Sequence, residues 1–243
     1  MAVVSVDLAY KDYQDIGVAV LADSPNGISC EFIQLQVRGI PTAENLSLAL
    51  VNLCMKYDSN ILLMDGPQGW RADDGAHVHS RDCERKLNTP AKTGPPSIVK
   101  PASYTPFVSF SISVFDGLTM HGWSRLSGDR SRIDLSKKWA IESFPLAAWG
   151  ALGIRSLPAK SQACEEDLRD RLKIISGKFG VMVSRSPNHD ELQALVAGLV
   201  GIWLARRDFR MISAVGLPPR IEIGTWREGF ILVPSIQSRL GSA

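Results

Sequence analysis

Several features that define common protein classes are scarce or missing in this sequence. Only four of its 243 residues are cysteines, and no two of them form a Cys-x-x-Cys pair, so we expect reduced thiols and a cytoplasmic location. The start Met1-Ala2-Val3 lacks the basic region that a secretory signal would need. The most apolar long stretch, 192–205, is too short and too interrupted by glycine for a membrane span, which predicts a buried helix.

An excess of charge of one sign is also missing. The formal net charge is +2, which does not indicate a strongly basic protein that coats DNA. Any contact with nucleic acid would therefore use a local patch. The hydrophobic content of 45% and the charged content of 21% are typical of a globular protein. We expect a single domain over 1–243, without internal repeats or low-complexity tracts.

The first 65 residues predict a meander followed by a crossover. Strand-like runs cover 2–8, 16–21 and 28–37, so the chain should open with three antiparallel strands. Thr42 is a candidate N-cap for a helix that leads to a fourth strand over 60–64. Because a strand, a crossover helix and a parallel strand form a right-handed unit, the fourth strand should pair beside the first.

The remainder predicts a long insertion and then more αβ structure. Residues 66–138 are rich in Gly, Pro and Ser, and they contain candidate short helices over 81–87 and 113–123. A long insertion after a strand end is where binding loops are expected. The later expected elements are a strand over 138–144, helices over 145–152, 163–176 and 188–207, and short strands over 220–224 and 229–233. The fold class is therefore α/β, with a mixed sheet flanked by helices.

Four acidic residues occupy comparable settings. Asp7 and Asp65 each end an apolar run, Glu142 follows a strand-like Trp-Ala-Ile, and Asp190 begins the long apolar helix. A cluster of carboxylates is unfavourable unless a cation neutralises it. The pattern predicts a site for a hard divalent metal, assembled from across the chain. Structural alternatives are a turn or cap role for the first two acids and a helix-dipole role for Asp190.

Six short motifs, each weak alone, follow one another in an order that is more specific than any one of them. They are Val4-Ser5-Val6-Asp7, Met64-Asp65-Gly66-Pro67, Arg81-Asp82-Cys83-Glu84-Arg85, Ile141-Glu142-Ser143-Phe144-Pro145, His189-Asp190-Glu191-Leu192-Gln193-Ala194 and Glu228-Gly229-Phe230-Ile231-Leu232-Val233-Pro234. In this order the chain resembles the DUF429 proteins, a group of predicted nucleases in the ribonuclease H-like superfamily.

The resemblance implies a ribonuclease H-like sheet and a nuclease that hydrolyses phosphodiester bonds in DNA or RNA with Mg²⁺ or Mn²⁺. By that resemblance, Asp7 would bridge two ions, Asp65 and Glu142 would hold one, and Asp190 would hold the other. His189 would move a proton or contact the leaving phosphate. A surface or cap role is the structural alternative for His189.

One departure from the family pattern favours a different function. Related proteins often carry a second acid three residues after the first helical Asp, where this chain has Gln193. Gln193 would fit a non-catalytic module that binds nucleic acid or a protein partner on the same scaffold. A phosphotransferase of the actin-like ATPase fold is a third hypothesis, although 7–11 lack the glycines of a phosphate loop. The oligomeric state, a homodimer included, stays open.

Candidate contacts to nucleic acid lie in two segments. Arg81, Arg85, Lys86 and Lys160 could bind phosphates. Arg81 and Arg85 would share a helical face, although the interleaved acids also fit a solvated helix. Trp70 and Trp123 could stack on bases, with packing as the alternative. A further group, His77 and His79 with Asp73 and Asp74, lies in a Gly-containing loop and makes a weak zinc candidate.

Overall fold

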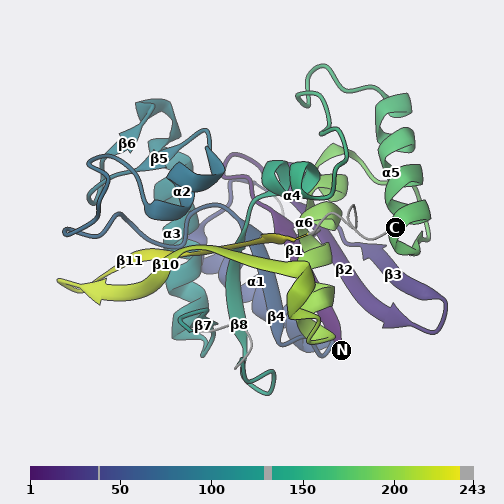
Figure 1. Cartoon of the computed structure of the whole chain (residues 1–243), viewed down its shortest axis with the longest axis horizontal. Helices are drawn as coiled ribbons and strands as arrows, with labels where there is room; N and C mark the ends of the chain where they lie inside the picture. The colour runs from purple at the N-terminus through teal and green to yellow at the C-terminus, as the bar shows by residue number, and fades with distance from the viewer. Residues whose placement is uncertain (38, 129–132, 236–243) are drawn as a thin grey trace, which may run out of the picture.

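A mixed β-sheet with helices on both faces forms the centre of the molecule (Figure 1). The computed structural model describes residues 1–37, 39–128 and 133–235. The strands are β1 (Ala2–Asp7), β2 (Gly17–Ser24), β3 (Gly27–Phe32), β4 (Ile61–Asp65), β5 (Lys92–Thr93), β6 (Val99–Lys100), β7 (Ser124–Arg125), β8 (Trp139–Ser143), β9 (Val181–Val183), β10 (Ile212–Glu222) and β11 (Thr225–Pro234). The helices are α1 (Ala43–Lys56), α2 (Asp82–Leu87), α3 (Thr105–Met120), α4 (Pro145–Ala151), α5 (Glu165–Phe179) and α6 (His189–Ala205).

The strand order of the main sheet is β10-β11-β8-β4-β1-β2-β3-β9. β1, β2 and β3 form an antiparallel meander, and β4 and β8 then pair in parallel beside β1. The predicted meander and crossover are therefore confirmed. Thr42 caps α1 as expected, because its side chain accepts a hydrogen bond from the Asn45 amide at 3.2 Å.

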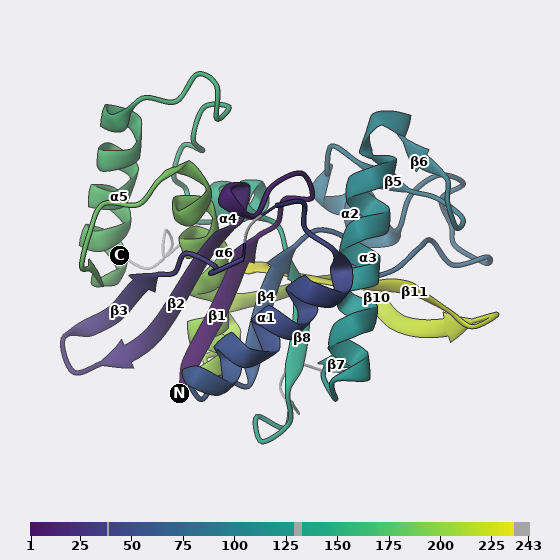
Figure 2. The same cartoon turned by 180° about the vertical axis from the view of Figure 1, so that it is seen from behind.

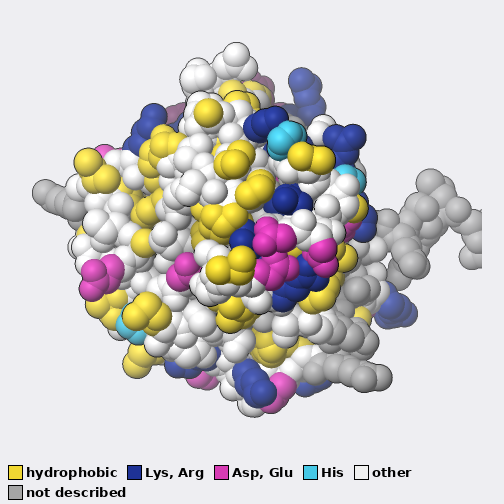
Figure 3. Space-filling view, turned by 90° about the vertical axis from the view of Figure 1, so that its left-hand side faces the viewer, with side chains coloured by type: hydrophobic (Ala, Val, Ile, Leu, Met, Phe, Trp, Pro, Cys, Tyr) yellow, Lys and Arg dark blue, Asp and Glu magenta, His cyan; other side chains and the backbone are white. Residues whose placement is uncertain are grey.

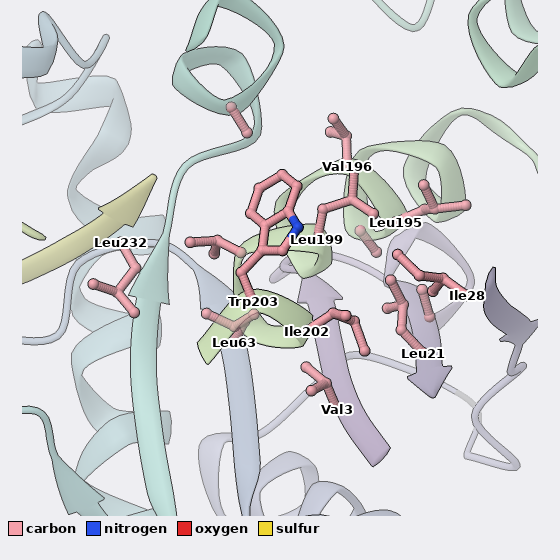
Figure 4. Packing of buried hydrophobic residues seen from close by; sticks show 14 of the residues in the cluster. Val3, Leu21, Ile28, Leu63, Leu195, Val196, Leu199, Ile202, Trp203 and Leu232 are labelled. Atoms are coloured by element: carbon pink, nitrogen blue, oxygen red, sulfur yellow. The ribbon is translucent and has the colours of Figure 1, made fainter. Parts of the chain in front are cut away.

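Different helices cover the two faces of the sheet. α1 and α3 pack on one face, as Figure 2 shows, against the apolar side chains of β1, β2 and β4 that point that way. α6 packs on the other face, where Leu199, Ile202 and Trp203 meet Val3 and Leu63 (Figure 4).

Glycines allow α6 to lie close to the strands. A Cβ added at Gly198 would lie 2.9 Å from the Ser5 Cβ, and one at Gly201 would lie 2.5 Å from a Val3 methyl. Because real Cβ atoms do not approach so closely, larger residues at these positions would push the helix away from the sheet. The glycines that argued against a membrane span thus permit close helix–sheet packing.

Several element boundaries and one strand of the main sheet differ from the sequence-based expectation. β3 ends at Phe32 instead of 37, and the short strand β9, which pairs in parallel with β3, was not predicted. α3 begins at Thr105 instead of 113, since Pro106 stands in its first turn, where proline is favourable. β10 begins at Ile212, well before 220, and the two prolines 218–219 lie at a register shift in this edge strand.

The predicted insertion, 66–138, joins the neighbouring strands β4 and β8. It contains α2, a small β5–β6 hairpin, α3 and β7, while its residues 129–132 lie outside the described part. Among the described residues, none of the helices has the length and apolar character that crossing a bilayer requires. All four cysteines are free, and Cys164 alone among them is exposed.

Candidate active site

Asp7 and Asp65 lie side by side at the carboxyl ends of β1 and β4. The parallel register aligns Val6 with Met64, so the next residue of each strand is one of these two acids. Burial raises the pKa of Asp7 well above its ordinary value, and the charges of Asp65 and Asp190 raise it further. Burial and the charge of Glu142 raise the pKa of Asp65 to about 7. The pair is thus a concentration of negative charge that the protein does not fully compensate.

The start of α6 brings Asp190 to the same place. Asn188 caps the helix by accepting from the Glu191 amide at 2.9 Å, which confirms the predicted cap. Gly17 is the register partner of Asp7, and a Cβ added there would lie 2.1 Å from the Asp190 carbonyl oxygen. The missing side chain at Gly17 therefore lets the first turn of α6 pack against β2 beside Asp7.

Lys160 and His189 hold the Asp190 carboxylate. The Lys160 ammonium lies 2.5 Å from Asp190 Oδ2 and 2.8 Å from Asp15 Oδ1, and its side chain is 52% exposed. His189 Nδ1 lies 3.3 Å from Asp190 Oδ1, and its Nε2 lies 3.1 Å from the Pro158 carbonyl oxygen. Burial opposes ionisation, yet hydrogen bonds from His189 and Lys160 lower the pKa of Asp190. Lys160, predicted to contact nucleic acid, is thus also an ion-pair partner within the site.

Glu142 points to the opposite face of the sheet from Asp7 and Asp65. It pairs in register with Met64, whose side chain packs on the α1 and α3 side. Arg81 donates two hydrogen bonds to the Glu142 carboxylate, at 2.8 and 2.7 Å, and the Gln68 amide donates a third at 3.1 Å. Burial nevertheless raises the pKa of Glu142. The chain therefore supplies its own cation to this acid.

The basic segment of α2 divides into one buried and two exposed residues. Arg81 is 1% exposed and also donates to Glu84 Oε1 at 3.0 Å, so the predicted solvent-facing pair with Arg85 does not form. The reason is that two buried carboxylates draw the guanidinium inward. Arg85 and Lys86 are exposed, and Lys86 pairs with Asp82 at 2.8 Å.

Three buried acids, Glu84, Glu191 and Glu228, were not identified as site residues from the sequence, and two of them bind backbone amides of the insertion. Glu84 accepts from the Arg81 and Thr93 amides at 3.1 and 2.8 Å. Its place three residues after the helix cap is a capping-box signal that could have been used. Glu228 accepts from the Ala72 and Asp82 amides at 3.1 and 3.2 Å, and so ties β11 to the insertion. Its only sequence signal is an acid within a strand-like tail.

The two tryptophans proposed to stack on bases are buried, at 7% exposure for Trp70 and 2% for Trp123. Their packing in the interior excludes base stacking in this conformation. Near the tip of the β10–β11 hairpin, acidic and basic side chains interleave at the surface (Figure 3). There Asp74 pairs with Arg220, and Glu222 lies 2.6 Å from the same guanidinium. The zinc hypothesis for the 73–79 loop gains no support from this ion-paired arrangement.

A cleft of about 530 Å³ opens beside Asp65. Acids and aromatic side chains share its lining, which includes Asp15, Asp65, Glu84, Glu142, Tyr10, Tyr104, Phe107 and Phe144. Gly66 lets Phe107 approach the end of β4, because its φ of +119° suits glycine and an added Cβ would lie 3.2 Å from the ring. Two of the four predicted acids, Asp65 and Glu142, therefore line a cavity of the size that binds small ligands.

The protein-family models that were scanned and the curated proteins that were searched contain no match to this chain. The resemblance to the DUF429 proteins therefore stays a prediction that the motifs alone support.

The residues fit one hard divalent ion better than two. Within residues 1–37, 39–128 and 133–235, no three His, Cys, Asp or Glu side chains are grouped closely enough to enclose a metal. Asp190 and Glu142 already have cationic partners in Lys160 and Arg81. Asp7 and Asp65 remain, and Mg²⁺ is commonly bound by one or two carboxylates together with water and substrate phosphates. The raised pKa values of both acids fit a site where a cation would relieve repulsion.

Proposed function

We propose that the protein is a divalent-metal-dependent nuclease that hydrolyses phosphodiester bonds in DNA or RNA. The observation that carries the proposal is the adjacent pair Asp7 and Asp65, whose repulsion is only partly compensated, with Asp65 lining an open cleft. Carboxylates that are buried without full compensation of their charge lower the stability of a fold, and such groups are found preferentially at functional sites.

The order of the elements supports a ribonuclease H-like scaffold. Three antiparallel strands are followed by parallel strands in the order β3-β2-β1-β4-β8, and α6 crosses β1, β2 and β4. Acids stand on the first strand, the fourth strand and the start of the late helix, at Asp7, Asp65 and Asp190. This is the placement that the resemblance implies, and it remains an argument by analogy of fold.

Asp7 and Asp65 would hold one Mg²⁺ or Mn²⁺. When bound, that ion would act as a Lewis acid on the phosphodiester. In hydrolysis, a water oxygen bonds to phosphorus while the ester P–O bond breaks, and the leaving oxygen takes up a proton. Lys160 is half exposed beside Asp190, so its ammonium can also donate a hydrogen bond to a phosphate oxygen. His189 has both ring nitrogens engaged, which suits it to orienting Asp190.

A non-catalytic module that binds nucleic acid or a protein partner is the second candidate function. It is favoured by the internal neutralisation of Glu142 and Asp190 and by the position of Gln193, whose Oε1 accepts from Trp149 Nε1 at 2.7 Å. In that conformation the Gln193 oxygen is directed to the indole. In that case, only Asp7 and Asp65 of the predicted acids are left to bind a metal ion, so metal binding by this pair decides between a nuclease and a non-catalytic module.

Calorimetric titration with Mn²⁺ tests the proposal without a choice of substrate. Wild type should bind about one ion, and Asp7→Asn should abolish that binding because Asn supplies no charge. The control is Asp58→Asn, an exposed residue at the far end of β4 with a φ of +48° that Asn tolerates. A screen of single-stranded and duplex DNA and RNA would follow. Wild-type protein that neither binds Mn²⁺ nor cleaves any of these would support the non-catalytic module.

A further inference from the structure

The cleft beside Asp65 is lined by two kinds of side chain. Tyr10 and Phe107 form a tilted aromatic pair with ring centroids 6.5 Å apart, and with Tyr104 they make up what we call the aromatic wall. The carboxylates of Asp65 and Glu142 belong to the same lining. All three aromatic side chains are half-buried, so part of each ring remains accessible.

The aromatic wall and the acidic pair are joined by short segments of chain. Tyr10 follows Asp7 by three residues in the loop after β1. Phe107, on α3, packs next to Gly66, the residue after Asp65. If a nucleic-acid strand had a phosphate at Asp7 and Asp65, the nucleoside next to that phosphate would therefore lie close to the aromatic wall.

The charges select the part of a nucleotide that this cleft can accept. Free phosphate is disfavoured at the Asp65 end of the cleft. Of the four lining acids, Glu84, Glu142 and Asp15 have cationic partners, whereas Asp65 has none among the described residues, and Lys11 is the one cationic side chain in the lining. A nucleobase is flat and uncharged, and the amino groups of adenine, guanine and cytosine can donate to carboxylates. Aromatic side chains stack on bases of any sequence.

We propose that this cleft binds one unpaired nucleobase against Tyr10 and Phe107, so that the substrate is a single-stranded or locally unpaired nucleic acid. This inference rests on the proposed function for its choice of ligand. A base within a duplex is stacked on its neighbours, and it would have to leave the helix to enter a cavity of this size. Duplex without an unpaired base is accordingly a poor ligand.

The chain offers a matched control for the aromatic wall. Lys11 lies 5.7 Å from the Tyr10 ring centroid, and Lys56 lies 5.0 Å from that of Tyr57. Both are Lys–Tyr pairs, but Tyr57 follows α1, at the end of the sheet opposite to the acids. Tyr10→Leu and Tyr57→Leu therefore remove the same ring from the cleft and from a remote surface.

The test is fluorescence anisotropy with one labelled sequence, as a short single strand and as its duplex, in buffer with EDTA. We expect wild type to prefer the single strand, and Tyr10→Leu to weaken single-strand binding by roughly tenfold, the loss of about one stacked base. Phe107→Leu should act in the same direction, and its thermal unfolding checks that it is folded. Tyr57→Leu should bind as wild type does.

Three results would overturn the inference: equal affinity for single strand and duplex, single-strand affinity that neither Tyr10→Leu nor Phe107→Leu changes, or no binding of the single strand. Because EDTA removes metal, these outcomes are independent of the Mn²⁺ titration. Failure of the stacking site and failure of the nuclease proposal are thus distinguishable.

Discussion

Two carboxylate pairs lie within the same part of the molecule and differ in how their charge is balanced. Glu84 and Glu142 share the buried guanidinium of Arg81, which lies within 3.0 Å of both. Asp7 and Asp65 form no ion pair of this kind within the described residues. The charge of Lys160 lowers the pKa of Asp7, but burial and neighbouring negative charge raise the pKa of each acid overall. The first pair joins the insertion to the sheet, whereas we propose that the second binds an external cation.

This difference separates a structural role from a proposed functional role among acids that look alike in the sequence. A buried ion pair with good geometry is strongly coupled to the fold, since loss of one partner leaves a buried charge. An acid pair without a cation makes the fold less stable at neutral pH and is useful only if something binds to it. Substitutions at the two centres should therefore change stability in opposite directions.

The largest effect is expected at the balanced centre. Arg81→Met would leave Glu84 and Glu142 buried without a cation, and the free energy of unfolding should fall by about 3–5 kcal/mol. Arg85→Met, an exposed neighbour, is the control and should change stability by less than about 0.5 kcal/mol. Urea unfolding followed by circular dichroism measures both. Equal stability of the two variants would mean that the Arg81 network contributes little to the fold.

At the unbalanced centre, removing an acid should stabilise the protein. Since the pKa of Asp65 is raised to about 7 from 3.8, the folded form keeps a proton that the unfolded chain loses above about pH 4. The stability that this bound proton contributes decreases as the pH rises from about 4 to about 7, and it is lost above pH 7. Asp65→Asn should therefore unfold at a higher temperature than wild type at pH 8. Its free energy of unfolding should be larger by at most about 4 kcal/mol.

The matched variant for this comparison is Asp58→Asn, at an exposed site. Its stability should follow that of wild type at every pH, and the gain in Asp65→Asn should shrink towards pH 4. Thermal unfolding in EDTA from pH 4 to 8 gives these differences. Destabilisation by Asp65→Asn at pH 8 would show that its carboxylate is compensated in the folded protein.

A smaller effect is expected at Gln193, which could have completed the acidic centre. Gln193→Asp shortens the side chain and should break the hydrogen bond from Trp149, at a cost of about 1 kcal/mol, without tightening Mn²⁺ binding. Gln193→Glu, which keeps the reach to the indole, is the control for stability. Tighter Mn²⁺ binding by Gln193→Asp would instead indicate a second ion position beside Asp190.

The smallest effect is expected from Lys160, whose half-exposed ammonium pairs with Asp190 and Asp15. Lys160→Met removes a nearby positive charge, so Mn²⁺ affinity should rise by roughly two- to fivefold, as expected for an exposed ion pair. Single-strand affinity in EDTA should fall, because the remaining charge is more negative. Lys178→Met, an exposed lysine on α5, should change neither quantity. Weaker Mn²⁺ binding by Lys160→Met would show that Lys160 positions Asp190 for the ion.

Much of the fold followed from local patterns in the sequence. Continuous apolar runs located β1 and β4, and caps at Thr42 and Asn188 located the starts of α1 and α6. The strand β9 was missed because it has only three residues and its partner, β3, is distant in the sequence. The first half of β10 was missed because prolines 218–219 interrupt its pattern. Strand pairing at such places depends on the rest of the sheet more than on intrinsic preference.

The sequence by itself determined that Asp7 and Asp65 would end neighbouring strands, because the crossover between β1 and β4 follows from the order of elements. The tertiary structure alone decided which acids receive a partner. Arg81 turns inward to Glu142 because burial favours pairing over exposure, and the missing side chain of Gly17 admits Asp190 next to Asp7. Charge balance depends on three-dimensional neighbours, and no spacing in the sequence encodes which acid is left without a cation.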